Sequence, residues 1–507
     1  MKTLLGIDIG TSSTKALLMD ENGTTIALKK QFYRISIPQP GWAEQNPEDW
    51  WQALIGALTQ ITEEFPEEMA NVAGVGLTGQ MHGLVAVDIE GKPVRPAIIW
   101  MDQRATKQLE EIQEKISWKE QANVFHNRVF NGFALASLLW MKENEPENYE
   151  RIYKVFQPKD YIRYCLTGRF GTEVSDASAA LFMNVKKRTW ATKQLNRLGI
   201  SESILPTLGK SMDIAGTVSF GVSLCTGIPE GIPVIFGAGD QQAQSIGNGV
   251  VKEGLMISNI GTGAQVSAYC KKDIYDGHLR THTFCHGIPD SYTIYGAMLC
   301  GGLSVRWLKN NILHGEKFQQ MSEKAEKVEP GCGGLIFLPY LTGERTPHMN
   351  PKARGIYFGL SLEHTDAHLT RAMMEGVAFA LKDSMRIMEE IGIPCEKMIA
   401  SGGACNSPLW LQIQADIFGK EVQVCRAREQ ACLGACIMAG VAVGLYENIE
   451  KACEQLIAFD EVIYKPREKY REMYENLYYK YRKIYKYTNR YMGFEREKGL
   501  SQKIEID

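Results

Sequence analysis

Residues 5–18 read LGIDIGTSSTKALL: an apolar run with a carboxylate near its end, a turn of glycine and hydroxyl residues, and a second apolar run. This order predicts two strands joined by a hairpin. The glycine lets backbone N–H groups approach phosphate oxygens, the hydroxyl groups add donors, and Asp8 is placed to hold a hydrated Mg²⁺ ion beside them. Taken alone, the stretch fits an ordinary tight turn equally well.

A second copy of this hairpin occurs at residues 255–267, which read LMISNIGTGAQVS. Two such hairpins far apart in the chain predict two related domains that face one nucleotide. The sequence lacks the Walker A pattern, in which Gly, any four residues and Gly-Lys precede Ser or Thr. Phosphate binding is therefore expected to depend on the two hairpins.

The length of the chain predicts its number of domains, and its net charge indicates the kind of partner it binds. Its 507 residues predict two domains of about 250 residues each, which we divide into 1–247 and 248–507. The formal net charge of −3 favours neither nucleic acid nor an anionic membrane as a partner. Asp8 interrupts the first apolar run before a signal-peptide core could form, and residues 431–446 are too few to span a bilayer. We therefore expect a cytoplasmic protein that acts on small molecules.

Three local patterns predict helices. Asn46 followed by Pro47 is typical of a helix start, and we expect a helix through Phe65. The smooth stretch 431–446 predicts a buried helix. Aromatic and apolar residues between 470 and 485 recur every three or four positions, which predicts an amphipathic terminal helix docked on the core. The 12 cysteines lack zinc-type spacing and are expected to be core thiols.

A candidate general base lies in residues 231–243, which read GIPVIFGAGDQQA. The apolar run predicts a strand, the glycines a turn, and the residues after them a helix, so Asp240 is expected where α/β folds place ligands. A carboxylate at this position suits proton abstraction from a hydroxyl that attacks a phosphate. Local sequence alone supports a helix-capping role for Asp240 equally well.

Four motifs in order resemble the FGGY family of carbohydrate kinases. They are GDQQ at 239–242, GTG at 261–263, LTGERTPH at 341–348 and SGGA at 401–404, and the similarity runs from Gly6 to about Tyr464. The resemblance implies two actin-like (ribonuclease H-like) α/β domains with ATP and sugar bound in the cleft between them. Ser137 departs from the family, which usually has a lysine there, and this change affects either the sugar pocket or a helix surface.

Within the family, the motifs GWAEQ at 41–45, GQMHG at 79–83 and WMDQR at 100–104 are most similar to members that phosphorylate xylulose. Glycerol kinases carry Arg-Glu where this chain has Met81 and His82. The resemblance thus implies ATP-dependent conversion of D-xylulose to D-xylulose 5-phosphate in pentose catabolism. Another ketose or polyol (ribulose, a deoxyketose, glycerol) and an ATPase of the actin or Hsp70 type remain alternatives.

The resemblance also assigns roles to residues. Asp240 corresponds to the catalytic base, and Asp8 to the acidic residue that supports Mg²⁺. The implied sugar-side residues are Met81, His82, Asp240, Gln241, Trp100, Asp102 and Arg104. The implied ATP-side residues are Thr11, Ser12, Ser13 and Lys15 of the first hairpin, Gly261, Thr262 and Gly263 of the second, and Gly402, Gly403 and Asn406 of the later turn. A homodimer is the family expectation for assembly.

One pattern is a decoy. Residues 74–79 read GVGLTG and match the dinucleotide-binding fingerprint Gly-x-Gly-x-x-Gly. That fingerprint requires a strand before it and a helix after it, whereas a further strand is expected at 84–88. We therefore assign this segment to the sugar site.

Overall fold

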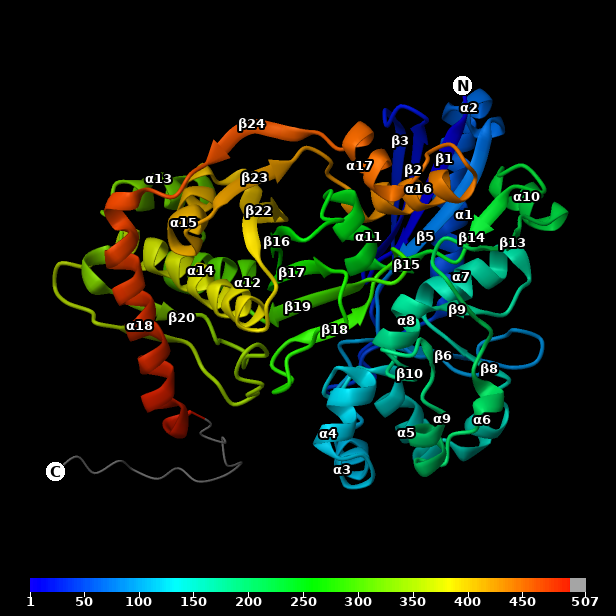
Figure 1. Cartoon of the computed structure of the whole chain (residues 1–507), viewed down its shortest axis with the longest axis horizontal. Helices are drawn as coiled ribbons and strands as arrows, with labels where there is room; N and C mark the ends of the chain where they lie inside the picture. The colour runs from blue at the N-terminus through cyan, green and yellow to red at the C-terminus, as the bar shows by residue number, and fades with distance from the viewer. Residues whose placement is uncertain (493–507) are drawn as a thin grey trace.

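The computed structural model describes residues 1–492 and contains two seven-stranded sheets (Figure 1). The first has the order β13-β14-β5-β1-β2-β3, with β15 paired to β5. Its strands are β1 (Thr3–Ile9), β2 (Ser13–Asp20), β3 (Thr25–Phe32), β5 (Val72–Gly79), β13 (Ile214–Thr217), β14 (Pro233–Ile235) and β15 (Ala238–Gly239). The predicted first hairpin is confirmed, because β1 and β2 pair antiparallel around residues 10–12.

The second sheet repeats this arrangement, with the order β18-β19-β17-β16-β22-β23-β24. Its strands are β16 (Gly254–Ile260), β17 (Ala264–Cys270), β18 (His282–Cys285), β19 (Tyr292–Met298), β22 (Cys395–Ser401), β23 (Glu421–Cys425) and β24 (Phe459–Tyr464). In each sheet the first hairpin strand also pairs in parallel with a later strand, β5 for β1 and β22 for β16. The second hairpin and the relation between the two sheets are therefore confirmed.

The predicted helices form close to their expected limits. Helix α1 (Pro47–Glu64) begins after Asn46, whose side chain accepts a hydrogen bond from the backbone N–H of Glu48. Helix α18 (Arg471–Thr488) buries its aromatic face, and the hydroxyl groups of Tyr481 and Tyr340 lie 2.7 Å apart. The terminal helix is therefore docked on the core, as predicted.

Helix α16 (Gln430–Ala442) is the predicted buried helix, and it packs against the sheet of the first half of the chain. Glycines make this approach possible. A Cβ atom at Gly76 of β5 would lie 2.0 Å from the carbonyl oxygen of Ala435. Helix α11 (Asp240–Gly247) also packs against α16, where a Cβ atom at Gly434 would lie 2.0 Å from the carbonyl oxygen of Ala243. The division at residue 247 stays a prediction.

The remaining elements cover the two sheets and form a lobe below the first one in Figure 1. The other helices are α2 (Pro66–Ala70), α3 (Thr106–Lys115), α4 (Trp118–Glu120), α5 (Ala134–Asn144), α6 (Pro146–Glu150), α7 (Pro158–Thr167), α8 (Val174–Ala179), α9 (Thr192–Arg197), α10 (Phe220–Thr226), α12 (Gly302–Trp307), α13 (Phe318–Glu326), α14 (Asp366–Glu390), α15 (Pro408–Phe418) and α17 (Ile449–Leu456). The other strands are β4 (Glu44–Gln45), β6 (Val85–Val87), β7 (Ala97–Ile98), β8 (Lys154–Phe156), β9 (Thr172–Glu173), β10 (Met183–Asn184), β11 (Thr189–Trp190), β12 (Leu208–Gly209), β20 (Ile336–Leu338) and β21 (Ile356–Phe358).

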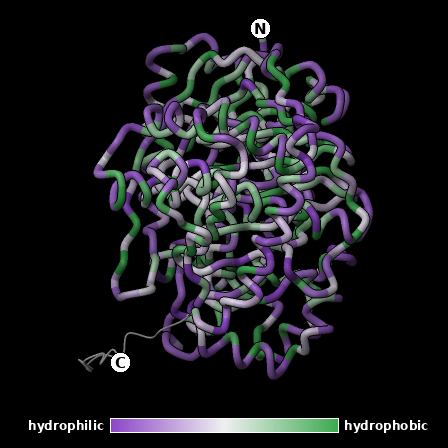
Figure 2. The backbone as a smooth tube through the Cα atoms, turned by 90° about the vertical axis from the view of Figure 1, so that its left-hand side faces the viewer, coloured by the Kyte–Doolittle hydropathy of each residue, from purple (hydrophilic) through white to green (hydrophobic). Residues whose placement is uncertain are grey.

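Hydrophilic residues dominate many of the outer loops, whereas hydrophobic stretches run through the interior (Figure 2). Within residues 1–492, each helix is either too short or too polar to cross a membrane. All 12 cysteines are free thiols, and nine of them are buried, which confirms the prediction of core thiols. The decoy motif lies inside strand β5 and leads to strand β6, so it lacks the helix that dinucleotide binding requires.

Candidate active site

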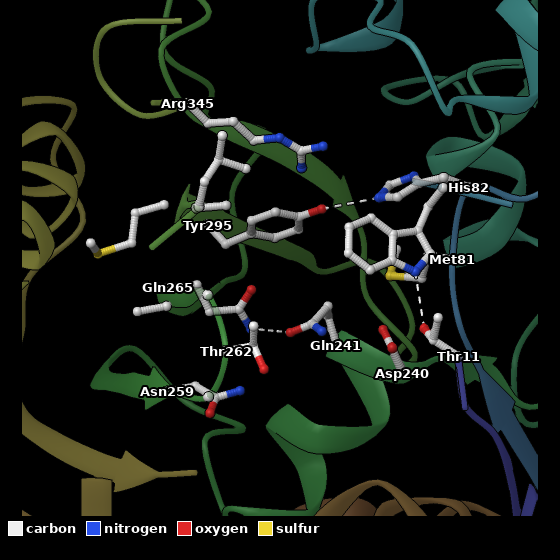
Figure 3. Close-up of a pocket in the computed structure, with 17 residues that line it drawn as sticks. Thr11, Met81, His82, Asp240, Gln241, Asn259, Thr262, Gln265, Tyr295 and Arg345 are labelled. Atoms are coloured by element: carbon white, nitrogen blue, oxygen red, sulfur yellow. Dashed lines mark hydrogen bonds between the residues drawn. The ribbon is translucent and has the colours of Figure 1, made fainter. Parts of the chain in front are cut away.

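A cavity of about 360 Å³ lies between the two hairpins (Figure 3). Both halves of the chain contribute to its wall. The first half supplies Thr11, Met81, His82, Trp100, Asp240 and Gln241; the second supplies, among others, Asn259, Gly261, Thr262, Gly263, Gln265, Tyr295 and Arg345. The structure thus brings together nine of the residues predicted for the sugar and the phosphates.

Asp240 is the first residue of α11 and faces this cavity. Gly239 occupies the capping position, and the helix end has no side-chain cap, so the capping alternative for Asp240 is not supported. Burial, with a smaller contribution from the nearby charge of Asp8, raises the pKa of Asp240 to about 7, although hydrogen bonding from Gln241 opposes the shift. A carboxyl group that titrates near neutral pH suits proton transfer.

Asp8 lies near the end of β1, 6% exposed. Its Oδ2 atom is 3.5 Å from Nζ of Lys15, and its Oδ1 atom is buried without a hydrogen-bond partner among the described residues. Burial raises the pKa of Asp8, and Lys15 opposes that shift. Lys15 itself donates to Oε2 of Glu429 at 2.6 Å, a partner that the sequence did not predict. The ammonium group is thus held beside Asp8.

The loop of the first hairpin is fixed by the side chains of two predicted motifs. Trp100 donates from Nε1 to Oγ1 of Thr11 at 3.0 Å, and Gln45 donates from Nε2 to the Thr11 carbonyl at 2.7 Å. Ser13 accepts from the backbone N–H of Gly10 at 3.0 Å through its carbonyl, and Ser12 is exposed at the tip. Trp100 therefore lines the cavity and holds a phosphate-type loop at the same time.

The loop of the second hairpin rests on the start of α12. The backbone N–H groups of Gly301 and Gly302 donate to the carbonyls of Thr262 and Gly261, at 3.1 and 2.8 Å. A Cβ atom at Gly263 would lie 2.8 Å from the carbonyl oxygen of Met298. Glycine is therefore needed for this close packing as well as for access to a ligand.

His82 forms the opposite end of the cavity from the second loop (Figure 3). Its Nδ1 atom lies 2.9 Å from the Ala179 carbonyl, and its Nε2 atom lies 3.3 Å from the hydroxyl of Tyr295. Burial lowers the pKa of His82 to about 4, so the ring is neutral at pH 7. Since a carbonyl can only accept, Nδ1 carries the proton and Nε2 is free to accept. Met81 precedes it and lines the cavity with its thioether side chain.

The structure does not bring Asp102 and Arg104 into the cavity, in contrast to the expectation that they line the sugar side. Both side chains are 1% exposed and bind each other at 2.8 Å. Asp102 also accepts from the backbone N–H of Ala43 at 2.7 Å, and Arg104 forms an ion pair with Glu44 at 2.7 Å. The guanidinium group lies 3.7 Å from the ring centre of Trp42. These partners explain the arrangement, because they join motifs 41–45 and 100–104 to each other.

The third predicted ATP-side group lines a separate cavity of about 600 Å³. Gly402, Gly403 and Asn406 lie in its wall, after strand β22. Asn259 of the first cavity donates from Nδ2 to Oε1 of Gln244, which lines the second, at 3.2 Å. The two cavities therefore adjoin at the second hairpin.

Sequence reasoning missed four polar residues of the cavity wall, which are Asn259, Gln265, Tyr295 and Arg345. Gln265 donates from Nε2 to Oε1 of Gln241, next to the candidate base. Arg345 extends over Tyr295 toward His82 (Figure 3). The motif at 341–348 was a signal for Arg345, whereas Tyr295 carries no local signal in its strand.

Ser137 is buried in α5 at 1% exposure. Its backbone N–H donates to the carbonyl of Phe133, whose ring centre lies 4.3 Å from that of His82. Ser137 itself is absent from the residues that line the cavity. Of the two alternatives, an exposed helix surface is wrong, and a change in the sugar pocket can only act through neighbours such as Phe133.

Comparison with known proteins identifies the class. The model of the FGGY family of carbohydrate kinases, N-terminal domain, matches residues 3–247, and that of the C-terminal domain matches residues 256–443. The chain belongs to the FGGY family of carbohydrate kinases and is an ATP-dependent sugar kinase.

Individual relatives and a solved structure show which sugar kinases the chain is similar to. A xylulose kinase of Lactococcus lactis is 36% identical over 490 residues, which cover 96% of this chain and 97% of that protein. A gluconokinase of Bacillus subtilis is 31% identical over 465 residues, covering 89% of this chain and 90% of that protein. The solved xylulose kinase from Rhodospirillum rubrum has a TM-score of 0.91 at 27% identity and covers 97% of this chain and 99% of its own. The prediction of two actin-like α/β domains is confirmed.

Proposed function

We propose that this kinase transfers the γ-phosphate of Mg·ATP to the 5-hydroxyl of D-xylulose, which yields D-xylulose 5-phosphate. The observation that carries the proposal is the position of Asp240. It lies in one cavity with a sugar-type end formed by Met81 and His82 and with the glycine-rich loops of both hairpins. Relatives that share this chain length and carry the name xylulose kinase support the choice of sugar.

The proposed role of Asp240 is that of general base. Its carboxylate accepts the proton of the attacking hydroxyl as the oxygen approaches the phosphorus in line. Gln241, whose hydrogen bonding lowers the pKa of Asp240, is itself held by a hydrogen bond from Gln265. Backbone N–H groups of the two loops, around Thr11 and Thr262, face the charge that develops on the transferred group.

The sugar would be oriented by neutral groups. Nε2 of His82 can accept from a sugar hydroxyl in place of Tyr295, and the Tyr295 hydroxyl can then donate to the same sugar. Met81 packs its thioether against the carbon chain. A neutral imidazole also adds no charge that would compete with the transferred phosphoryl group.

The residues present fit a magnesium ion that arrives with the nucleotide. Oδ1 of Asp8 is a buried oxygen without a partner among the described residues, and Asp8 is close enough to raise the pKa of Asp240. Residues 1–492 contain no cluster of three or more ligating side chains, and Mg²⁺ typically needs only one or two carboxylates beside phosphate oxygens and water. Asp8 would hold the ion, which supplies neutralisation of phosphate charge when bound.

A sugar acid is the second candidate substrate. Arg345 is buried in the wall of the cavity and, among the described residues, forms no ion pair with a carboxylate. Its guanidinium group could bind the carboxylate of gluconate in two places at once. The gluconokinase relative is consistent with this candidate.

The test is ADP release with Mg·ATP and a panel of D-xylulose, L-xylulose, D-ribulose, L-ribulose, glycerol, gluconate and no sugar, compared by kcat/KM. The proposal expects D-xylulose to exceed every other sugar by at least about tenfold, which corresponds to about 1.4 kcal/mol. A preference for gluconate would favour the second candidate. ADP release that is independent of any sugar would contradict both.

A further inference from the structure

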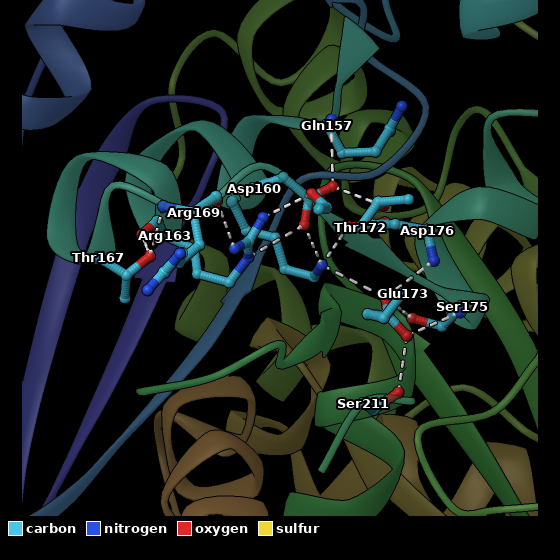
Figure 4. A network of polar contacts seen from close by, with 12 residues as sticks. Gln157, Asp160, Arg163, Thr167, Arg169, Thr172, Glu173, Ser175, Asp176 and Ser211 are labelled. Carbon is cyan, nitrogen blue, oxygen red and sulfur yellow. Dashed lines mark hydrogen bonds and ion pairs between the residues drawn. The ribbon is translucent and has the colours of Figure 1, made fainter. Parts of the chain in front are cut away.

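A network of buried charges and hydroxyl groups surrounds Glu173 (Figure 4). At its centre, Oε2 of Glu173 accepts from the backbone N–H of Ser175 at 2.8 Å and from the hydroxyl of Ser211 at 2.6 Å. Oε1 accepts from the hydroxyl of Ser175 at 2.6 Å and from the backbone N–H of Asp176 at 2.9 Å. Lys159 lies 3.3 Å from the same carboxylate. Glu173 is therefore held rigidly, and it fixes the direction of the Ser175 hydroxyl.

Ser175 connects this network to the candidate base. Its Oγ atom accepts a hydrogen bond from the backbone N–H of Gly239 at 3.0 Å. Because the hydrogen of the same hydroxyl is donated to Glu173, only its lone pairs face Gly239. Gly239 is the residue that precedes Asp240 and caps α11. The position of the base is thus tied to a side chain that lies outside the cavity.

Gly239 is confined from its other side as well. A Cβ atom there would lie 2.8 Å from Cγ and 3.0 Å from Sδ of Met81. Its strand β15 pairs with β5, with Gly239 opposite Gly79. The backbone before Asp240 is therefore clamped between Ser175 and the sugar side of the cavity.

Helix α8, which begins next to Glu173, contacts Gly239 near its first residue and the cavity residue His82 at its last. Ser175 in its first turn holds Gly239, and the carbonyl of Ala179 at its last residue accepts from Nδ1 of His82 at 2.9 Å. In between, the hydroxyl of Ser178 accepts from the backbone N–H of Cys285, in strand β18 of the second sheet. A single short helix thus sets the separation between the base and the sugar-binding imidazole.

We infer that Ser175 is a positioning residue of this kinase: its hydroxyl, oriented by Glu173, holds the Gly239 N–H and thereby aims the carboxylate of Asp240 at the sugar hydroxyl. The inference rests on the proposed role of Asp240 as base. It predicts that losing the hydroxyl weakens proton transfer in the transition state while leaving sugar binding intact, because Ser175 makes no contact with the cavity.

The test compares Ser175→Ala with Ser211→Ala. Both variants remove one buried hydroxyl that donates to Glu173, but only the first removes the acceptor of Gly239. The expected result is a kcat about tenfold lower for Ser175→Ala, with the sugar KM within about twofold of wild type, and a kcat within about twofold for Ser211→Ala. Equal losses in the two variants, or an unchanged kcat in Ser175→Ala, would overturn the inference.

Two further measurements keep the test decisive. Thermal unfolding of both variants shows whether each is folded at the assay temperature. If Ser175→Ala is unfolded there, Ser175→Cys takes its place, since the slightly larger thiol leaves no cavity but is a weak acceptor, and the same loss of kcat is expected. Wild-type enzyme without sugar-dependent ADP release would refute the proposed function itself, whereas an active wild type with an unimpaired Ser175→Ala would refute only the positioning role.

Discussion

The two hairpins share one backbone plan and differ in charge. In the first, Asp8 pairs across the strands with Lys15; in the second, the corresponding cross-strand pair is Asn259 and Gln265. Asp8 keeps one buried oxygen without a partner among the described residues, whereas Asn259 is bonded to Gln244. The difference teaches that, of the two hairpins, only the first carries charged side chains at this cross-strand position. The second hairpin supplies neutral amides and backbone donors.

This asymmetry fits a phosphoryl-transfer site. A carboxylate on each hairpin would place an additional negative charge beside the γ-phosphate, which already carries the charge of the reaction. Amide side chains can contact the same oxygens without that repulsion. The comparison therefore predicts that changes on the first half remove the chemistry and that changes on the second half weaken binding.

The largest effect is expected from Asp240→Asn, which keeps the shape of the side chain and removes the proton acceptor. We expect kcat to fall about 10³-fold with the sugar KM changed only a few-fold, as for the loss of a general base. Coupled ADP release measures both constants. Asp213→Asn, an exposed carboxylate outside the main cavity, is the control and should retain wild-type activity. More than a tenth of the wild-type kcat in Asp240→Asn would show that the base is another group.

The next effect tests the comparison directly, because Asp8→Asn gives the first hairpin the residue type of the second. We expect kcat to fall about 10²-fold and the KM for Mg·ATP to rise, since the carboxylate for the metal is lost. The double variant with Asn259→Asp moves that carboxylate to the second hairpin. Its kcat should stay at or below that of Asp8→Asn, and recovery of activity in the double variant would mean that the two hairpins are interchangeable.

The third prediction concerns pH. The pKa of Asp240 is raised to about 7, so the protonated form, which cannot accept a proton, accumulates below that value. kcat/KM for the sugar should therefore fall about tenfold for each pH unit below 7 and level off above it. Initial rates between pH 5 and 9 check this dependence. An acidic limb centred near pH 4, the ordinary range of an aspartic acid, would contradict the burial of the base.

Smaller effects are expected from changes at the sugar end of the cavity, beginning with His82→Asn. Asparagine tolerates the positive φ of 73° at this position, so the backbone is preserved, but its side chain is too short to replace Nε2. The sugar KM should rise about tenfold, while the KM for ATP stays within about twofold. Tyr295→Phe, which removes only the hydroxyl that faces Nε2, is the matched comparison and should raise the sugar KM less. A similar rise in the KM for ATP would place His82 outside the sugar site.

Local chemistry explains why much of the site could be predicted from the sequence. In each hairpin, and around Asp240, the glycines and polar residues are consecutive, so their shared role is visible in a few positions. Long-range pairing is different. Lys15 binds Glu429, which is 414 positions away, and Tyr295 reaches the cavity only because β19 pairs with β17. Neither contact can be predicted from the residues that stand next to Lys15 or Tyr295 in the sequence.

The sequence also does not show which partners a buried charged residue will bind. Asp102 and Arg104 stand next to the cavity residue Trp100 in the sequence, and their types suit sugar binding equally well. The structure pairs them with each other and with Glu44 in the interior. Whether a carboxylate and a guanidinium face a ligand or one another depends on packing against Trp42, which the sequence does not specify.

The central claim is most directly tested by the position of the phosphate in the product. Enzyme, Mg·ATP and D-xylulose are incubated to completion, and the product is analysed by phosphorus and carbon NMR. The account predicts one phosphate ester, with phosphorus coupled to C5 of the sugar, formed in equal amount to ADP. Phosphate on another carbon, or inorganic phosphate as the only phosphorus product beside ADP, would contradict it.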